Sequence, residues 1–182
     1  MKKNRLSSYY IILFVFLQVL GVIIGVGVVN AEGGEVEGAT LTAEQKSVIM
    51  NHCDTIKDSL KSLQRTDSRA RVYLGRYYET ILSSFITPLN LRLVENNISN
   101  PKLLDNQTNF ASRRTDFVND YIVYQQALEE LVNTNCKTEP EKFYEKIEVA
   151  REKRKAVNKD VAKLRGLVDE QQKLVEELKN GL

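Results

Sequence analysis

The chain has 182 residues, of which 42% are hydrophobic and 27% are charged, with three prolines and no tryptophan. This length suits one ordinary domain, and the composition excludes collagen-like and low-complexity proteins. The formal net charge is +2 at pH 7, but residues 1–31 hold three basic residues and no acidic one, which leaves 23 basic and 24 acidic residues, a net charge of −1. Such a near-neutral remainder argues against a nucleic-acid-binding protein, which shows a basic face.

Residues 1–31 have the pattern of an export signal. A basic start is followed by 21 residues, 9–29, in which Gln18 is the only strongly polar side chain. Two interpretations remain open. One is a signal peptide cleaved after Ala31, since small residues occupy the positions before the cut, and the other is an uncleaved anchor long enough to cross the bilayer. In both, the basic flank stays in the cytoplasm and the rest of the chain is exported.

Residues 32–41 form a predicted flexible tether, because they are rich in Gly and Glu and have no apolar periodicity. The predicted folded part covers residues 42–180. Thr42 and Gln45 form a capping box that indicates the start of a helix. No pattern typical of β-strands follows, so we expect an all-α fold.

The first predicted helix spans about residues 42–95. Its apolar residues recur at heptad spacing, which is typical of a helix packed along its length against other helices. This seam comprises Ile49, Cys53, Ile56, Leu60, Leu63, Ala70, Leu74, Tyr77 and Ile81, with Asp67 as a polar interruption. Thr87-Pro88 is expected to kink or restart the helix, because proline lacks the amide N–H and clashes with the preceding turn.

Two further helices are predicted after short loops. Asn100 as cap and Pro101 at the first helical position begin the second, which ends near residue 134. A capping box at residues 138–141 begins the third, which runs to about residue 180. The second seam is Leu103, Gln107, Phe110, Arg114, Phe117, Tyr121, Tyr124, Leu128 and Leu131, and the third is Phe143, Ile147, Ala150, Arg154, Val157, Val161, Leu164, Val168, Gln171, Val175 and Leu178. Three helices of about 40 residues predict an elongated, antiparallel, coiled-coil-like three-helix bundle, roughly 60 Å long.

Cys53 and Cys136 are the only cysteines. In an oxidising compartment the simplest interpretation is a disulfide between them, while two buried free thiols or a cross-link between chains are the alternatives. Antiparallel neighbours pair positions of nearly constant sum, so this bridge places the hairpin apex near residues 94–95. That position lies slightly before the loop expected at residues 96–100, and the kink at Pro88 is expected to absorb the difference.

A wider pattern extends over nearly all of the predicted exported part. It comprises Cys53, Ile56, Lys57, Asp67, Arg71, Val72, Gly75, Tyr78, Glu79, Asn90, Arg92, Phe117, Asp120, Tyr121, Tyr124, Cys136, Pro140, Phe143, Tyr144, Arg151 and Arg154. In spacing and general character it resembles a group of uncharacterised exported helical proteins of candidate-phyla bacteria such as Saccharibacteria. The resemblance implies export, a helical fold and the cysteine pair, and it implies no activity.

No catalytic, cofactor-binding or metal-binding residues are predicted. His52 is the only histidine, and a zinc site needs more ligands than one histidine beside an oxidised cysteine. No nucleophile, base and orienting group stand in a recognisable arrangement, and no Gly-rich phosphate loop occurs. We therefore expect a protein without a cofactor.

Asp67 and Arg154 are predicted to pair across the bundle. Both are polar residues at seam positions, and they are level when residues are counted along the parallel first and third helices. Tyr121 or Tyr124 is expected to complete the hydrogen bonds. Such a buried pair mainly fixes register, because desolvation opposes the attraction. The alternative is that both side chains reach solvent at the edge of the bundle.

The expected function is that of a non-enzymatic exported or membrane-tethered helical bundle, a structural or interaction module of the cell envelope. Its expected partners are a protein or a second copy bound through the third helix, and the membrane through residues 1–31 if they are retained. No nucleic-acid partner is expected. The alternative function is a periplasmic chaperone or carrier of apolar ligands, with a cleft near Phe110, Phe117 and Tyr121.

Overall fold

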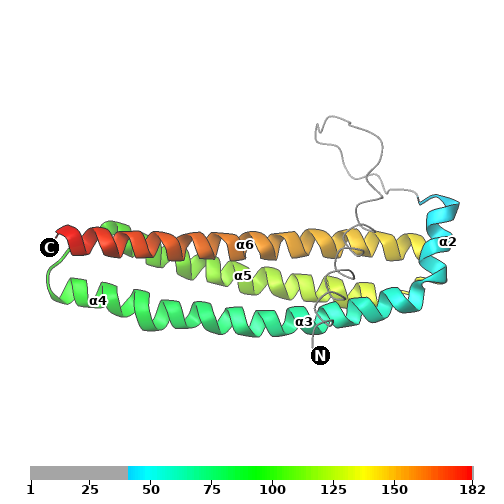
Figure 1. Ribbon diagram of the computed structural model, residues 1–182, viewed down its shortest axis with the longest axis horizontal. Helices are drawn as coiled ribbons and strands as arrows, with labels where there is room; N and C mark the ends of the chain where they lie inside the picture. The colour runs from blue at the N-terminus through cyan, green and yellow to red at the C-terminus, as the bar shows by residue number, and fades with distance from the viewer. Residues whose placement is uncertain (1–40, 182) are drawn as a thin grey trace, which may run out of the picture. The chain divides into compact units, whose positions relative to one another are not determined.

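The structure is a computed structural model that describes residues 41–181. The predicted signal or anchor at 1–31 and residues 32–40 of the predicted tether lie outside the described residues. The described part is helical and contains no strand, which confirms the all-α class, and its helices pack together (Figure 1). They are α2 (Ala43–Asn51), α3 (Cys53–Thr80), a π-helical turn (Ile81–Ile86), α4 (Thr87–Glu95), α5 (Pro101–Asn133) and α6 (Pro140–Gly181).

Local capping explains where the helices begin. The capping box before α2 is confirmed, since the Gln45 N–H donates to Thr42 Oγ1 over 3.2 Å and the Thr42 N–H donates to Gln45 Oε1 over 2.9 Å. At the start of α5 the Leu103 N–H donates to Asn100 Oδ1 over 3.2 Å, with Pro101 as the first helical residue. In the loop before α6, Asn135 Oδ1 accepts from the Lys137 N–H over 3.0 Å and from the Thr138 N–H over 3.4 Å, and no side-chain hydrogen bond of the box expected at residues 138–141 forms among the described residues.

The turn between α4 and α5 has the geometry of a Schellman motif. Asn97 adopts a φ of 58°, in the left-handed region. Its N–H donates to the Val94 carbonyl over 3.0 Å, and the Ile98 N–H donates to the Leu93 carbonyl over 2.8 Å. Ile98 then packs beside Leu93, as the motif requires. Asparagine tolerates the left-handed backbone better than most residues, so the residue at position 97 favours this turn.

The first predicted helix is not one continuous α-helix. It breaks at His52, whose φ of −104° and ψ of 11° end α2 before α3 begins at Cys53. Figure 1 shows α2 turned across the end of the other helices instead of extending α3. An ion pair of 2.6 Å between Lys46 Nζ and Glu141 Oε1 links α2 to α6. The heptad pattern runs through residue 52 without a slip, so periodicity alone does not reveal this corner.

At Thr87-Pro88 a new α-helix begins, which is the second of the two predicted outcomes, a kink or a restart. Six residues before Thr87 form the π-helical turn, and a new α-helix begins at Thr87 with the proline in its first turn. A π turn widens the backbone spiral, which gives room for a proline ring that clashes with the carbonyl four residues earlier in a regular α-helix. The backbone stays helical throughout, so α4 continues the course of α3 in Figure 1.

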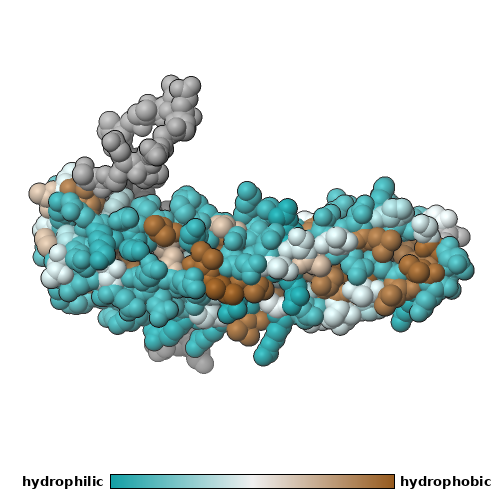
Figure 2. Space-filling model, turned by 180° about the vertical axis from the view of Figure 1, so that it is seen from behind, coloured by the Kyte–Doolittle hydropathy of each residue, from teal (hydrophilic) through white to brown (hydrophobic). Residues whose placement is uncertain are grey.

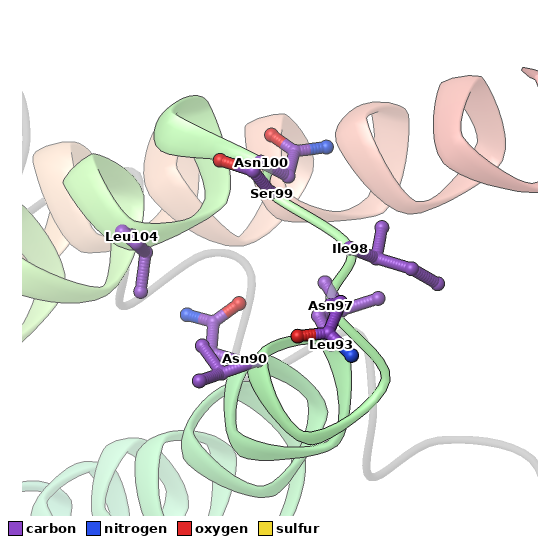
Figure 3. Close-up of a pocket in the computed structure, with 8 residues that line it drawn as sticks. Asn90, Leu93, Asn97, Ile98, Ser99, Asn100 and Leu104 are labelled. Atoms are coloured by element: carbon purple, nitrogen blue, oxygen red, sulfur yellow. The ribbon is translucent and has the colours of Figure 1, made fainter.

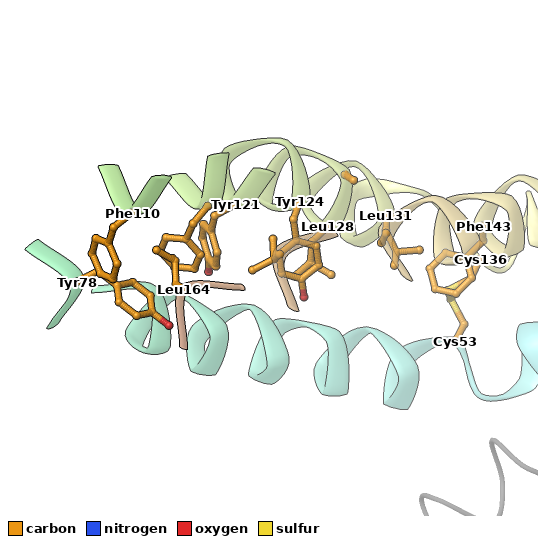
Figure 4. Close-up of a cluster of buried hydrophobic side chains, with 14 of the residues drawn as sticks. Cys53, Tyr78, Phe110, Tyr121, Tyr124, Leu128, Leu131, Cys136, Phe143 and Leu164 are labelled. Atoms are coloured by element: carbon orange, nitrogen blue, oxygen red, sulfur yellow. A yellow bond between two sulfur atoms is a disulfide. The ribbon is translucent and has the colours of Figure 1, made fainter. Parts of the chain in front are cut away.

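The core lies along α5, which packs against α3 and, more extensively, against α6. Figure 4 shows its buried side chains in a row between the helices, from Tyr78 and Phe110 to Phe143 and the disulfide. The largest fully buried side chains are Ile86, Phe110, Phe117, Tyr124, Leu128, Leu131, Cys136, Phe143 and Leu164, together with Leu103 at the α4–α5 end. Burying each such side chain contributes about 1.5–3 kcal/mol. Seven of the nine predicted seam positions of α5 are buried.

In the second half of α3 the predicted seam is wrong at Tyr77, whereas Leu74 and Ile81 pack against the core as predicted. Tyr77 is 46% exposed, whereas Tyr78 is 3% exposed. The Tyr78 ring packs edge-on against Phe117, with ring centroids 5.7 Å apart. A strict heptad drifts by about 20° per repeat around a straight helix, so the buried face moves forward along the chain.

A smaller core joins Leu93, Leu103 and Leu174 at the end of the helices where the α4–α5 turn lies.

Seen from behind, the surface is mostly hydrophilic, and apolar side chains form separate patches on it (Figure 2). Within residues 41–181, none of the helices has the combination of length and apolar character that crossing a bilayer requires.

Candidate functional site

A disulfide joins Cys53 and Cys136, with their Cα atoms 5.6 Å apart. Both cysteines are almost completely buried, 3% and 0% exposed, and Phe143 packs beside them (Figure 4). The bridge links the first residue of α3 to the loop that follows α5. Because the sulfur atoms of a buried disulfide neither ionise nor bind metals readily, we interpret the bridge as a structural cross-link.

Asp67 on α3 and Arg154 on α6 form a bidentate ion pair. Arg154 Nε lies 3.2 Å from Asp67 Oδ2, and Arg154 Nη2 donates to Asp67 Oδ1 over 3.2 Å. The Tyr124 hydroxyl donates to Asp67 Oδ2 over 2.7 Å. The Asp67 side chain is 14% exposed and that of Arg154 is 47% exposed. The structure thus brings these residues together at the edge of the core, and only the carboxylate end of the pair is buried.

Burial controls the tyrosine hydroxyls around this pair. It is the largest cause that raises the pKa of Tyr124, and the hydrogen bond to Asp67 adds to it, because ionisation replaces a donated proton with a second negative charge. Burial likewise raises the pKa of Tyr121, and the neighbouring Ser68 hydroxyl partly offsets this rise, although the two groups form no hydrogen bond of good geometry. Both rings are therefore neutral donors at physiological pH.

A recess of about 140 Å³ adjoins the ion pair, between α3, α5 and α6. We call it the central recess. Its polar lining consists of Asp67, Arg71, Tyr121, Tyr124, Arg154 and Asn158, and its other lining residues are apolar. Arg71 lies over the Tyr121 ring, with its Cζ 5.2 Å from the ring centroid. Sequence reasoning missed Arg71, although its spacing of four residues from Asp67 places both on one helix face.

A second polar group in the core was also missed. Asp160 on α6 is 4% exposed. Its Oδ1 lies 3.7 Å from Lys163 Nζ, while Oδ2 has no partner. Burial raises the pKa of Asp160, and the neighbouring Asp120 carboxyl on α5 adds to the effect. The spacing of three and four residues from Val157 and Leu164 is the signal that could have placed Asp160 on the buried face.

A larger pocket of about 290 Å³ lies beside the α4–α5 turn (Figure 3). Its lining includes Asn90, Leu93, Asn97, Ile98, Asn100 and Leu104. Asn90 is 3% exposed. Its amide donates 2.6 Å to Gln107 Oε1 and 3.1 Å to the Leu103 carbonyl, whereas Asn90 Oδ1 has no partner. The pocket has no charged lining residue.

The outward face of α3 carries an aromatic and basic stripe. We define the α3 stripe as Arg65, Arg69, Val72, Tyr73, Arg76 and Tyr77, all of which are exposed. The rings of Tyr73 and Tyr77 are nearly parallel, with centroids 6.5 Å apart. None of the three arginines makes an ion pair with another described residue. The stripe therefore presents unused positive charge beside flat apolar surface.

His52 is exposed at the α2–α3 corner. Within residues 41–181 no cluster of three metal-ligand side chains occurs. Phe110 and Phe117 are packed in the core at 0% and 1% exposure.

Comparison of the chain with protein-family models, with curated proteins and with solved structures finds no match.

Proposed function

We propose that the chain is a non-enzymatic helical module, exported from the cytoplasm, that acts at the cell envelope by contact with another macromolecule. Disulfides persist in oxidising compartments, so the Cys53–Cys136 bridge supports export. In this proposal α3 with α4, α5 and α6 act as the three antiparallel arms of one elongated bundle, held at the end of a tether or released by cleavage after Ala31.

The observation that carries the proposal is the α3 stripe. Tyrosine and arginine are the residues most enriched in protein interfaces, because they combine large contact area with hydrogen bonding and charge. Tyr73 is 70% exposed, which is unusual for a residue without a partner to cover it. The unpaired arginines at 65, 69 and 76 select an acidic partner.

Charge also supports a different macromolecule over a second copy as the partner. A two-fold interface through this stripe brings the same basic patch of both copies together, so that the arginines of one copy approach those of the other. This arrangement is repulsive, and it favours a different, acidic macromolecule. The carrier of apolar ligands has less support, because Phe110 and Phe117 fill the core and the recess beside Tyr121 is small and polar.

Site-specific photocrosslinking in the native cells tests this function. A photoreactive phenylalanine analogue replaces Tyr73 in the full chain, and the matched control carries it at the exposed Lys153 of α6. We expect a discrete adduct from position 73 that disappears in the Arg69→Glu, Arg76→Glu background and at high salt. An adduct that forms equally from position 153, or that survives the charge reversal, contradicts the proposal.

A further inference from the structure

We propose that the central recess binds a small oxyanion, a carboxylate or phosphate-type group, through Arg71 and Arg154. This inference does not depend on the macromolecular contact proposed above, since the α3 stripe and the recess share no residue. It follows from the charges, the unused donors and the size of the recess.

The recess has an excess of positive charge. Asp67 is its only carboxylate, against the guanidinium groups of Arg71 and Arg154. Asp67 already accepts one hydrogen bond from Tyr124 and is paired bidentately with Arg154. Arg71 makes no ion pair or hydrogen bond through its side chain within residues 41–181, although a guanidinium carries five N–H donors. Arg71 is therefore available to a ligand that enters the recess.

A buried donor points in the same direction. The Tyr121 hydroxyl is buried, in a residue that is 4% exposed, and Ser68 is its neighbouring hydrogen-bonding side chain, but the two form no hydrogen bond of good geometry. Figure 4 shows this hydroxyl directed toward α3, the helix that carries Arg71. The Ser68 hydroxyl lies 2.8 Å from the Gln64 carbonyl and 3.3 Å from Gln125 Oε1, so both of these contacts hold it on α3 beside the recess. A bound acceptor supplies the hydrogen bond of good geometry that this buried hydroxyl lacks within the fold.

Size and charge restrict the class of ligand. A volume of about 140 Å³ is below the range of about 300–1,000 Å³ typical of pockets for larger organic ligands, but it far exceeds the space of one water. A cation is repelled by the two guanidinium groups. A small oxyanion fits, because guanidinium groups bind carboxylate and phosphate oxygens in bidentate geometry. Arg154, at 47% exposed, gives such an ion access from solvent.

The test is a titration of the protein as isolated from its cells, in detergent if residues 1–31 are retained. Sodium phosphate, sodium sulfate and sodium acetate are added separately at constant ionic strength, and binding is followed by calorimetry and by the NMR resonances of the arginine side chains. We expect saturable one-site binding of at least one anion, with shifts at Arg71 and Arg154. Stronger binding of phosphate than of acetate identifies a phosphate-type ligand, and the reverse order identifies a carboxylate.

Variants locate the site. Arg71→Ala is expected to weaken binding by at least about tenfold, and Tyr121→Phe by about fivefold. Arg71→Lys is expected to fall between wild type and Arg71→Ala, since lysine keeps the charge but loses the bidentate geometry. Arg69→Ala is the matched control, because Arg69 lies on the same helix outside the recess. The absence of saturable heat and of arginine shifts with all three anions overturns the proposal, as does a folded Arg71→Ala that binds as tightly as wild type.

Discussion

The hydroxyl of Tyr124 on α5 lies 2.7 Å from the Asp67 carboxylate on α3, and the same carboxylate is held by Arg154 on α6. One acidic side chain thus receives donors from both other long helices. Because a carboxylate at 14% exposure needs these donors, we expect the three side chains to favour one relative register of α3, α5 and α6.

Loss of the Tyr124 hydroxyl should be costly. Tyr124→Phe keeps the ring in the core but removes a donor from a charged acceptor, and we expect a loss of about 2 kcal/mol in the free energy of unfolding. Urea denaturation followed by circular dichroism measures it. Tyr73→Phe is the control, since Tyr73 is 70% exposed and should change stability by less than about 0.5 kcal/mol. Equal effects of the two substitutions contradict a specific role for the hydrogen bond.

Stability should fall in alkaline solution. The pKa values of Tyr78, Tyr121 and Tyr124 are raised from the ordinary value of 10.0, mainly by burial. Above pH 10 the unfolded chain therefore binds fewer protons at these positions than the folded protein does, and the free energy of unfolding decreases as pH rises further. Ultraviolet titration should show three tyrosines ionising after the others. Tyr124→Phe should make the decrease shallower, and an unchanged slope speaks against the assignment.

The disulfide should contribute much of the stability. It closes a loop with a sequence separation of 83 residues, and the chain-entropy estimate for such a loop is about 4 kcal/mol. The Cys53→Ala, Cys136→Ala double variant should lower the free energy of unfolding by about that amount. Alkylation of freshly isolated, denatured protein should modify neither cysteine before reduction and both after it. Two reactive thiols before reduction exclude the bridge in the native protein.

The Asp67–Arg154 pair should show a modest coupling energy. In a double-mutant cycle with Asp67→Asn and Arg154→Gln we expect about 1 kcal/mol, because Arg154 is 47% exposed and solvent screens the attraction. The exposed pair of Glu152 and Lys155 on α6 is the comparison, with an expected coupling near zero. If both cycles give the same value, the central pair has no special role in register.

Asp160 should destabilise the folded protein at neutral pH. Its pKa is raised from 3.8 by burial and by Asp120, so the folded state retains this proton after the unfolded state has lost it. The free energy of unfolding therefore falls as pH rises through the range just above 3.8. Asp160→Asn should raise stability at pH 7 and flatten this dependence. Asp169→Asn, at an exposed position of α6, should do neither, and a stability loss in Asp160→Asn contradicts the interpretation.

The sequence predicts the helices well where the signal is local. Caps at Thr42 and Asn100, and the apolar period of α5, are governed by neighbours within a few residues, and the structure has both caps and the buried face. The corner at His52 was not predictable in the same way, since it depends on the contact of α2 with α6 across the fold. The core position that the heptad pattern assigns to Tyr77 is occupied by Tyr78, because the true helical period differs slightly from the heptad.

The candidate site divides in the same way. Asp67 and Arg154 could be placed at the same level by counting residues along α3 and α6, because both helices run in the same direction and each residue advances the helix by a fixed rise. The sequence did not predict the central recess or the place of Arg71 in it, because a cavity depends on the side chains of three helices together and cannot be predicted from the seam of one helix. It did not predict the burial of Asp160 either. Polar residues at the margin of an apolar stripe are the class in which such positions should be sought.

The position of the sulfur bridge divides the fold into covalently closed and open parts. The disulfide closes residues 53–136 into a covalent ring. The helix α6 begins outside that ring and is held against it by packing and polar contacts. Partial unfolding can therefore start with α6 peeling from its C-terminal end while the α3–α5 hairpin persists. Hydrogen exchange at the last turns of α6 should consequently outpace exchange at the centre of α5.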